Sequence, residues 1–489
     1  MAVEHVDVLI VGAGLSGIGA AAHLQDRCPD TTWTIVEARE DIGGTWDLFR
    51  YPGVRSDSDM FTLGYSFRPW TDPAAIAGGA AILDYVRDTA RERGIDRAVR
   101  FGHRIVAAEW SSAEARWTVT AETAAGTVEL TCSFLYFCAG YYRYDRGHVP
   151  TLPAIDRFAG EIVHPQHWPA NFDWAGKKIV VIGSGATAVT LVPALAQTAA
   201  HVTMLQRSPS YVLSLPARDP LAQTLFARLP RGLAAAVVRM KNVLLTALTY
   251  RLSRRYPDGV RKRLLDAVRR QLPVGYDVAS HFSPTYDPWD QRLCVVPDGD
   301  LFRAVREGRA SVVTDRIATL TEHGVALTSG EELPADVLVT ATGLSLLMLG
   351  GATLTVDSRP VDLSRAVVYK GAMLSGVPNL ALTFGYVNAS WTLKADLVAA
   401  YVCRLLRYLR AHGGAVATPT APSDDDLAPL IALRSGYVQR SADLLPRRGR
   451  TGPWRLSNSY LHDLLTLRLG RIDDGRLRIT APAREQVTS

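Results

Sequence analysis

Short apolar runs that precede glycine-rich turns are the most regular feature of the hydrophobic pattern. Residues 8–11 and 179–182 are continuous runs of Val, Ile and Leu, as expected for strands that are buried on both faces of a parallel sheet. After each turn comes a segment of helical length and then a second predicted strand, at 32–36 and at 201–205. This strand–helix–strand order predicts an α/β fold with two Rossmann-like domains in one chain.

The turn after the first strand has the spacing GxGxxG of a dinucleotide-binding loop. Gly12 allows the tight turn, Gly14 lets the backbone approach a pyrophosphate, and Gly17 lets the next helix pack on the strand. That helix starts near Ser16 and presents its free N–H groups to the phosphates. Glu37 ends the second strand, where a carboxylate binds ribose hydroxyls and repels a 2′-phosphate. The first site is therefore predicted to bind FAD or NAD rather than NADP.

The second turn differs in the features that select the nucleotide. Ala188 replaces the third glycine, which the motif tolerates, and Arg207 stands where the first domain has an acid. A guanidinium can pair with a 2′-phosphate through two hydrogen bonds, so NADPH is the predicted ligand. A surface arginine in a basic protein would explain the same residue. The predicted contacts in this domain are Gly183, Gly185, Ala186, Thr187, Arg207 and Ser208.

Two further short strands, 134–138 and 337–342, end in turns of small residues. Such turns permit close approach to a cofactor, for which Thr342 and Gly343 are candidates, or a crossing between domains. We therefore expect the second nucleotide domain to be inserted into the first, with a helical subinsertion of its own. The predicted division is an FAD-binding domain from 1–145 and 344–489, an NADPH-binding domain from 146–212 and 291–343, and a helical insertion at 213–290.

Composition and charge set limits on the class of protein. A chain of 489 residues has room for two or three domains, and its net charge of +6 is mild. The basic residues are most notable in 228–270, where they alternate with apolar residues at helical spacing. Such a helix can lie on an anionic membrane, and solvated faces of an insertion packed on the enzyme would give the same pattern. No nucleic-acid-binding module accompanies these charges.

The cysteines and the N-terminus indicate a cytoplasmic protein. The five cysteines are scattered, without the spacing of a metal site or of a redox pair, and we expect them to be reduced core residues and no metal to be bound. The N-terminus has no signal pattern, and no run of 18 apolar residues occurs. Membrane contact, if present, is predicted to be weak and peripheral.

Two longer motifs narrow the function. Residues 43–57 match [AG]GxWxxxx[FY]P[GM]xxxD, and residues 158–169 match FxGxxxHxxxW[PD]. Together they resemble the type I Baeyer–Villiger monooxygenases, which are class B flavoprotein monooxygenases. The resemblance implies that the protein uses FAD, NADPH and O2 to convert ketones to esters or lactones, and to oxidise sulfides and thioamides at sulfur.

The resemblance also implies roles for individual residues. Gly44, Thr45 and Trp46 would lie at the flavin, Tyr51 would pack about it, and the turn at 51–53 would carry Asp57 to the reacting face. In the family, an arginine that corresponds to Arg292 stabilises negative charge beside the flavin, and Asp57 would orient it. A structural salt bridge is the alternative role for this arginine. On the substrate side, the candidates are Asn388 and Trp391, although Trp391 could equally be a core residue.

The second motif contains a histidine that could be mistaken for a general base. His164 is predicted instead to be a hinge residue that positions the two domains, together with the other fixed positions of the motif, Phe158, Gly160 and Trp168. One position departs from the family pattern: Gln291 stands where many relatives have a lysine that helps to bind the 2′-phosphate. Arg207 and Ser208 would therefore carry most of the NADPH preference.

Three alternatives remain at this point. The first is a flavin monooxygenase that acts only on soft sulfur or nitrogen atoms, and the Trp168–Pro169 ending of the motif argues against it. The second is a pyridine-nucleotide disulfide reductase, which needs a close cysteine pair. The third is a non-catalytic flavin-binding or membrane-adaptor protein, for which the basic helical region is the motive.

Overall fold

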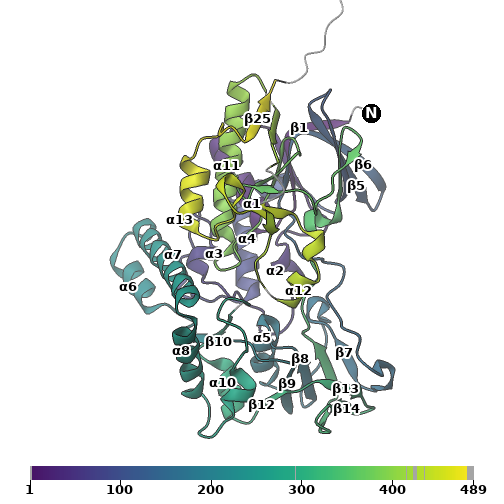
Figure 1. Ribbon diagram of the computed structural model, residues 1–489, viewed down its shortest axis with the longest axis vertical. Coiled ribbons are helices and arrows are strands. Elements are labelled where there is room, and N and C mark those ends of the chain that lie inside the picture. Colours follow the sequence, from purple (N-terminus) through teal and green to yellow (C-terminus); the bar gives the residue numbers. More distant parts are fainter. Residues whose placement is uncertain (1–2, 292, 415, 422–426, 434, 482–489) are drawn as a thin grey trace, which may run out of the picture.

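Two domains, each built on a parallel sheet, lie one above the other along the long axis of the molecule (Figure 1). The structure is a computed structural model that describes residues 3–291, 293–414, 416–421, 427–433 and 435–481. We call the domain with the nine-stranded sheet the first domain and the one with the five-stranded sheet the second domain.

The first domain combines a parallel sheet with an antiparallel meander. Its strand order is β18-β17-β4-β5-β6-β1-β2-β3, and β21 pairs with β6. The strands are β1 (Glu4–Val11), β2 (Trp33–Val36), β3 (Val99–Arg100), β4 (Arg104–Ser111), β5 (Arg116–Thr123), β6 (Gly126–Phe137), β17 (Thr353–Val356), β18 (Arg359–Pro360) and β21 (Leu380–Leu382). The sequence pattern predicted only the last part of β6, and the meander of β4 to β6 was missed.

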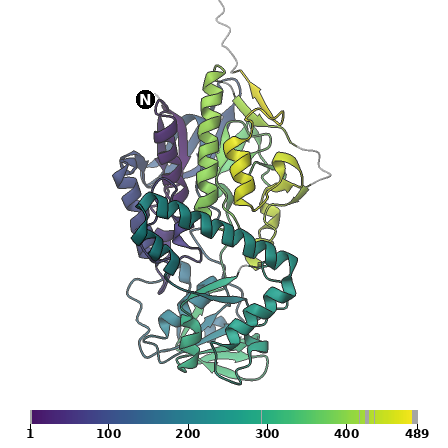
Figure 2. The ribbon, with the colours of Figure 1, turned by 90° about the vertical axis from the view of Figure 1, so that its left-hand side faces the viewer.

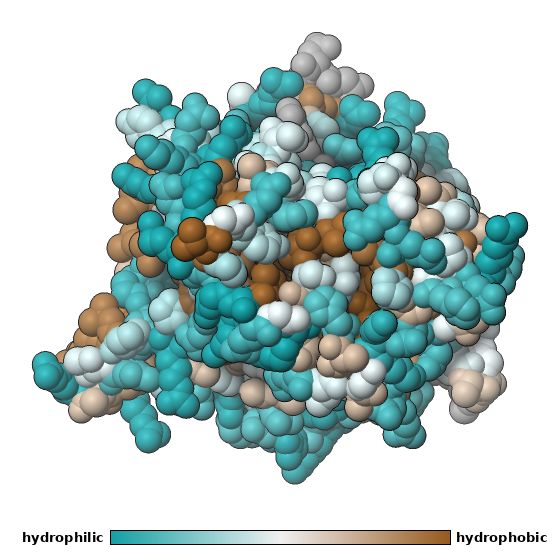
Figure 3. Space-filling model, turned by 90° about the horizontal axis from the view of Figure 1, so that it is seen from below, coloured by the Kyte–Doolittle hydropathy of each residue, from teal (hydrophilic) through white to brown (hydrophobic). Residues whose placement is uncertain are grey.

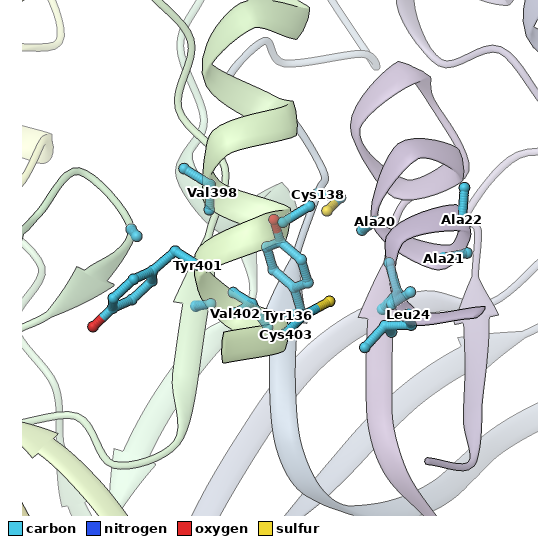
Figure 4. Packing of buried hydrophobic residues seen from close by; sticks show 14 of the residues in the cluster. Ala20, Ala21, Ala22, Leu24, Tyr136, Cys138, Val398, Tyr401, Val402 and Cys403 are labelled. Carbon is cyan, nitrogen blue, oxygen red and sulfur yellow. The ribbon is translucent and has the colours of Figure 1, made fainter. Parts of the chain in front are cut away.

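The second half of β1, residues 8–11, is buried on both faces, as its continuous apolar sequence predicted. Val8 and Ile10 face a cluster formed with the helices α1 (Leu15–Arg27), α4 (Gly79–Glu92) and α11 (Trp391–Ala411). Leu9 faces a second cluster on the opposite side of the sheet. Figure 4 shows the first cluster, where Tyr136 lies between the helix that carries Ala20 and the helix that carries Cys403. The small side chains of α1 let α11 pack closely against it.

The second domain has the order β12-β9-β8-β16-β7, with all pairs parallel. Its strands are β7 (Glu161–Val163), β8 (Lys178–Ile182), β9 (His201–Gln206), β12 (Ala310–Thr314) and β16 (Val337–Thr340), and its helices are α5 (Ala186–Leu195) and α10 (Asp300–Arg306). A small antiparallel sheet of β13 (Ile317–Leu320), β14 (Gly324–Leu327) and β15 (Glu332–Pro334) covers one face. The chain leaves the first sheet after β6 and returns to it with β17, so the second domain lies within the first in sequence.

A group of helices interrupts the second domain between β10 (Val212–Leu215) and β11 (Cys294–Pro297), which pair in parallel. They are α6 (Pro220–Arg228), α7 (Arg231–Arg255), α8 (Pro257–Arg269) and α9 (Val278–Phe282). The predicted boundary between residues 212 and 213 therefore lies inside β10. In Figure 2, the long helix α7 crosses in front of the boundary between the two domains.

Shorter elements complete the chain. The helical segments are α2 (Thr45–Leu48), α3 (Met60–Leu63), η1 (Ile95–Ala98), η2 (Ile155–Arg157), η3 (Pro165–His167), η4 (Met348–Gly351), α12 (Gly436–Gln439), η6 (Ala442–Leu444), η7 (Gly452–Trp454), α13 (Tyr460–Asp463) and η8 (Leu464–Leu469). The strands are β19 (Val368–Tyr369), β20 (Met373–Leu374), β22 (Val416–Pro419), β23 (Leu427–Pro429), β24 (Arg447–Gly449) and β25 (Leu477–Thr480).

Candidate functional site

A cavity of about 1510 Å³ lies between the two domains and is lined by both glycine-rich turns. The sequence-predicted residues in its lining are Gly12, Gly14, Ser16, Glu37, Gly44, Thr45, Trp46, Asp57, Gly183, Gly185, Ala186, Thr187, Arg207, Ser208, Thr342, Gly343 and Trp391. The predicted residues that do not line it are Gly17, Phe158, Gly160, His164, Trp168 and Asn388. Arg292 lies outside the residues that the structure describes.

The first turn is packed so tightly that two of its glycines have no room for a side chain. A Cβ atom on Gly12 would lie 2.8 Å from the carbonyl oxygen of Cys138, and one on Gly17 would lie 1.8 Å from the oxygen of Gly12. Gly14 precedes α1, and no side chain caps the N-terminus of that helix. The first-turn N–H groups are therefore available to a ligand in the cavity, as a dinucleotide pyrophosphate requires.

Glu37 lies at the end of β2, buried, with both carboxylate oxygens accepting backbone hydrogen bonds. Oε2 accepts from the N–H of Ala13 at 2.7 Å, and Oε1 accepts from the N–H of Arg39 at 2.9 Å. Burial raises the pKa of Glu37, and the two backbone N–H groups oppose that shift. The carboxylate is thus fixed by the turn itself and borders the cavity where ribose hydroxyls would bind.

The loop after β2 is held by a buried carboxylate that the sequence analysis did not identify. Asp47 in α2 accepts hydrogen bonds from three arginines: Arg39 at 2.6 Å, Arg50 at 2.6 Å and Arg87 at 3.3 Å. Beside it, Thr45 shares a 3.1 Å hydrogen bond with the hydroxyl of Tyr144. These contacts fix the part of the loop that lines the cavity.

Further along, the same loop contacts the second domain. Tyr51 was expected to pack about the flavin, and it does line the cavity, but its ring belongs to the core of the second domain with residues of α5. Burial raises the pKa of Tyr51 to about 12. Gly53 lies against α5 as well, because a Cβ there would lie 2.8 Å from that of Ala194. The loop therefore docks on the second domain just before Asp57.

The second turn has the same construction as the first. A Cβ on Gly183 would lie 2.3 Å from the carbonyl oxygen of Ala341, and no side chain caps the helix after Gly185. Arg207 is exposed and borders the cavity, and the backbone oxygen of Ser208 accepts a 3.0 Å hydrogen bond from Ser184. The arrangement leaves a guanidinium and free helical N–H groups on one wall, which fits a phosphate-rich ligand.

The two chain segments that cross between the domains are joined by hydrogen bonds of His148. The hydroxyl of Thr342 donates to the oxygen of His148 at 2.6 Å, and the N–H of His148 donates to the oxygen of Gly343 at 3.1 Å. Gly343 has a φ of +103°, which a glycine adopts without strain. The two chain segments that connect the domains therefore run side by side at the cavity wall.

None of residues 158–169, which form the second motif, lines the cavity. Phe158 is a core residue, and Gly160 has no room for a Cβ, which would lie 2.3 Å from the oxygen of Asp336. His164 Nδ1 accepts a hydrogen bond from the N–H of Gln166 at 3.1 Å. Trp168 packs edge-to-face on Phe172. These placements give the motif packing and positioning contacts.

Gln166 links this motif to the segment that contacts Thr45 of α2, and sequence reasoning missed it. Its buried amide donates to the backbone oxygens of Arg143 at 2.8 Å and Tyr144 at 3.0 Å. Tyr144 in turn contacts Thr45. A glutamine inside a motif carries no local signal of such a role, because its partners lie about twenty residues earlier in the chain.

Of the two substrate-side candidates, only one lines the cavity. Trp391 lines the cavity, and its indole N–H donates to Ser16 Oγ at 2.7 Å, which joins α11 to the first turn. Asn388 points elsewhere, since its amide donates to the backbone oxygen of Asn458 at 3.1 Å. Tyr386 lines the cavity instead, and its hydroxyl donates to Asp463 at 2.7 Å.

Comparisons with known proteins bear on this arrangement. Residues 5–220 match the model of a family described as flavin-binding monooxygenase-like. The FAD-containing monooxygenase EthA of Mycobacterium tuberculosis is 56% identical over 97% of this chain and 98% of its own, and EthA of Mycolicibacterium smegmatis is 53% identical over 98% and 97%. The chain belongs to the family of FAD-containing monooxygenases. The family and enzyme class predicted from the sequence are thereby confirmed.

Solved structures agree on the fold of this monooxygenase. A crystal structure of OTEMO in complex with FAD and NADP has a TM-score of 0.72 at 21% identity and covers 86% of this chain and 87% of its own. An open crystal structure of cyclohexanone monooxygenase has a TM-score of 0.71 at 20% identity, with 85% and 90% covered. The α/β prediction with two Rossmann-like domains is confirmed.

Within the described residues, no three His, Cys, Asp or Glu side chains come together as a metal site would require. All five cysteines are buried free thiols. The family membership, rather than either of these observations, separates this monooxygenase from the disulfide reductases.

Proposed function

We propose that this monooxygenase uses FAD and NADPH to insert one oxygen atom of O2 into ketones, giving esters or lactones, and to oxidise sulfides and thioamides at sulfur. The observation that carries the proposal is the single cavity lined by both glycine-rich turns, one followed by Glu37 and the other by Arg207. The solved OTEMO structure, which holds FAD and NADP, supports the same pair of cofactors.

FAD would bind the first domain. Gly12, Gly14 and the uncapped N-terminus of α1 would take the pyrophosphate, and Glu37 would accept hydrogen bonds from the adenosine ribose. Gly44, Thr45 and Trp46 would lie along the flavin. When bound, the flavin supplies hydride acceptance and the reaction with dioxygen, while the protein supplies binding, orientation and exclusion of water.

NADPH would bind the second turn across the cavity. Gly183, Gly185 and the following residues, Ala186 and Thr187, would take its pyrophosphate, and Arg207 with Ser208 would pair with the 2′-phosphate. Thr342 and Gly343 border both sites from the domain crossing. Because Gln291 offers no positive charge, Arg207 carries most of the discrimination against NADH.

Asp57 and Arg292 are proposed as the catalytic pair. Asp57 lines the cavity on the loop that docks against the second domain. Arg292 follows Gln291, which lines the cavity as well. The arginine would stabilise the negative charge that develops during oxygen transfer, and the aspartate would orient it.

The test is an incubation of the purified holoenzyme with NADPH and isotopically labelled O2, together with a panel of ketones and thioethers. We expect an ester or lactone that contains one labelled oxygen atom, and a labelled sulfoxide from the thioether. Labelled sulfoxide without any ester would favour an enzyme restricted to sulfur or nitrogen atoms. NADPH consumption that needs neither substrate nor oxygen would favour a non-catalytic role.

We also propose that this is a cytoplasmic enzyme with weak peripheral contact to anionic membranes through α6 to α8. By length and composition alone α7 could cross a membrane, but Arg239 pairs with Asp396 of α11 and fixes it to the first domain, and Lys241 pairs with Asp219 at the start of α6. Brown, hydrophobic surface is visible at the left edge of the molecule in Figure 3. The outer face of α7 exposes the apolar residues Leu233, Val237, Met240, Leu244, Leu245, Leu248 and Leu252. Lys262 and Arg263 follow on α8, and no acid pairs with either among the described residues.

Sedimentation with lipid vesicles tests this contact. The enzyme should sediment with phosphatidylglycerol vesicles at low salt and should be released by high salt, because screening weakens the attraction of basic residues. Phosphatidylcholine vesicles are the control. Equal recovery with both vesicle types, or with neither, would contradict the proposal.

A further inference from the structure

A second, smaller cavity of about 260 Å³ lies between α7 and the first domain. On the side of α7, its lining residues follow one stripe of the helix: Gly232, Ala236, Met240 and Val243. On the side of the first domain, Phe61 of α3 and Trp70 form its wall. The lining is mostly apolar, and nothing in the family motifs refers to it.

The cavity opens onto an apolar surface. Gly232, Ala236 and Met240 are exposed, whereas Val243 and Phe61 are each only 4% exposed, so the cavity runs inward from α7. Met240 also belongs to the exposed apolar face of α7 described above. A molecule that reaches this face by its apolar part would therefore meet the mouth of the cavity directly.

The inner end lies one layer of side chains from the large cavity. Val243, Tyr386 and Leu393 form one buried apolar cluster, and Ala389 packs against it. Tyr386 and Ala389 both line the large cavity. The short helix α3 divides the two spaces in the same way, since Phe61 lines the small cavity and Leu63 lines the large one.

The guanidinium and the indole N–H at this cavity already have partners in the protein. The guanidinium of Arg239 donates to the backbone oxygens of Gly64 at 2.7 Å and Phe61 at 3.2 Å, and it lies 3.4 Å from the carboxylate of Asp396. The indole N–H of Trp70 donates to the oxygen of Ala74 at 3.0 Å. The site thus favours a neutral apolar chain over an anionic ligand, because its cation is neutralised.

We propose that this small cavity is a vestibule for substrates with an unbranched alkyl chain. The chain binds between α7 and α3, and displacement of the Val243 side chain from its cluster with Tyr386 admits the substrate to the large cavity. The inference rests on the proposed oxygenation function and adds to it a substrate class and a route. Compact ketones that enter through the open side of the large cavity do not need the vestibule.

The first test uses a substitution that narrows the opening of the small cavity. Ala236→Trp is compared with Leu245→Trp, an exposed position of the same helix that does not line the cavity. For Ala236→Trp, kcat/KM with a long-chain methyl ketone should fall by at least about tenfold, the effect of leaving about two methylene groups unburied. The same variant should turn over cyclohexanone like the wild type. Equal chain-length profiles in the two variants would overturn the proposal.

The second test does not depend on turnover. Crystals of the wild-type holoenzyme are soaked with a long-chain methyl ketone that carries a terminal bromine, and the bromine is located by its anomalous scattering. We expect bromine between Phe61 and Met240, and its absence from that cavity would overturn the proposal. If the wild type oxidises no ketone at all, the proposed function fails, and the bromine position still decides whether the vestibule binds alkyl chains.

Discussion

Arg55 and Asp300 form an ion pair that joins the two domains at the edge of the large cavity. Arg55 Nη1 lies 2.6 Å from Asp300 Oδ2, and Nη2 lies 3.4 Å from Oδ1. The two side chains are only 12% and 20% exposed. Arg55 stands two residues before Asp57, and Asp300 begins α10 of the second domain. The pair therefore couples the position of the loop that carries Asp57 to the position of the second domain.

Asp300→Asn removes the charge of this ion pair and keeps a side chain of the same size. We expect a loss of about 1.5–3 kcal/mol in the free energy of unfolding, the usual contribution of a hydrogen bond to a charged group. More NADPH should be consumed per ester formed, because the loop is less well positioned. Urea unfolding and the ratio of product to NADPH measure the two effects.

Asp266→Asn is the matched control for this variant. Asp266 pairs with Arg269 on an exposed helix face, where such a pair is worth about 0–1 kcal/mol. If both substitutions gave the same small change in stability and coupling, the pair between Arg55 and Asp300 would have no special role.

Arg207→Gln tests the assignment of the second nucleotide site. Removing the guanidinium should lower kcat/KM for NADPH by about 10–100-fold, because a charge-assisted contact of about 1.5–3 kcal/mol is lost. The value for NADH should stay within about twofold, since NADH has no 2′-phosphate. Arg316→Gln, an exposed residue of the same domain outside the cavity lining, is the control. An equal loss of kcat/KM for both nucleotides would show that Arg207 does not bind the 2′-phosphate.

The local parts of this site were predictable from sequence and the long-range parts were not. The turns at Gly12 and Gly183 follow from residue type and spacing, because the backbone at those points leaves no space for a Cβ. The packing of Tyr51 with residues of α5 was not predicted, because it depends on where the second domain docks. Gln166, Arg239 and their partners carried no local signal, because each bonds to chain segments that only the fold brings near.

The strands were also predicted only in part. The sequence pattern predicted β1, β2, β8, β9, β16 and the end of β6, but it did not predict the other parallel strands, β3, β7, β12, β17 and β21. The meander of β4 to β6 lacks continuous apolar runs over most of its length: β5 alternates between buried and less buried residues, as a half-buried strand does, and β6 begins at Gly126 with four exposed residues. Asn388 shows the limit for side chains: its segment does reach the cavity, yet the tertiary contact with Asn458 turns it aside.

Glu37→Gln should change how stability depends on pH. Burial raises the pKa of Glu37 in the folded protein, so the folded state holds a proton at pH values where the unfolded chain has lost it. The stability of the wild-type apoprotein should therefore fall as pH rises from the ordinary glutamate pKa to the raised one. Glu37→Gln should lack that fall. Urea unfolding of both apoproteins across this pH range makes the comparison, and parallel curves would contradict the assignment.

His164 offers the sharpest test of the positioning role proposed for the second motif. Its Nδ1 accepts the N–H of Gln166, whose side chain holds the linker at Arg143 and Tyr144. Burial lowers the pKa of His164, so the neutral ring that can accept this bond is the form present at neutral pH. The bond and the stability it provides are kept at high pH and are lost as pH falls below the ordinary histidine value.

Two substitutions at this position should therefore differ. Asn can accept the same N–H as a cap and Ala cannot, a difference of about 1 kcal/mol. We expect His164→Ala to release more hydrogen peroxide per NADPH than the wild type, and His164→Asn to recover much of the coupling and to lose the acid sensitivity. A proton-transfer role predicts the opposite, because asparagine cannot titrate and both variants would then be equally inactive. Peroxide release, ester yield and their pH profiles in the three proteins distinguish positioning from acid–base catalysis.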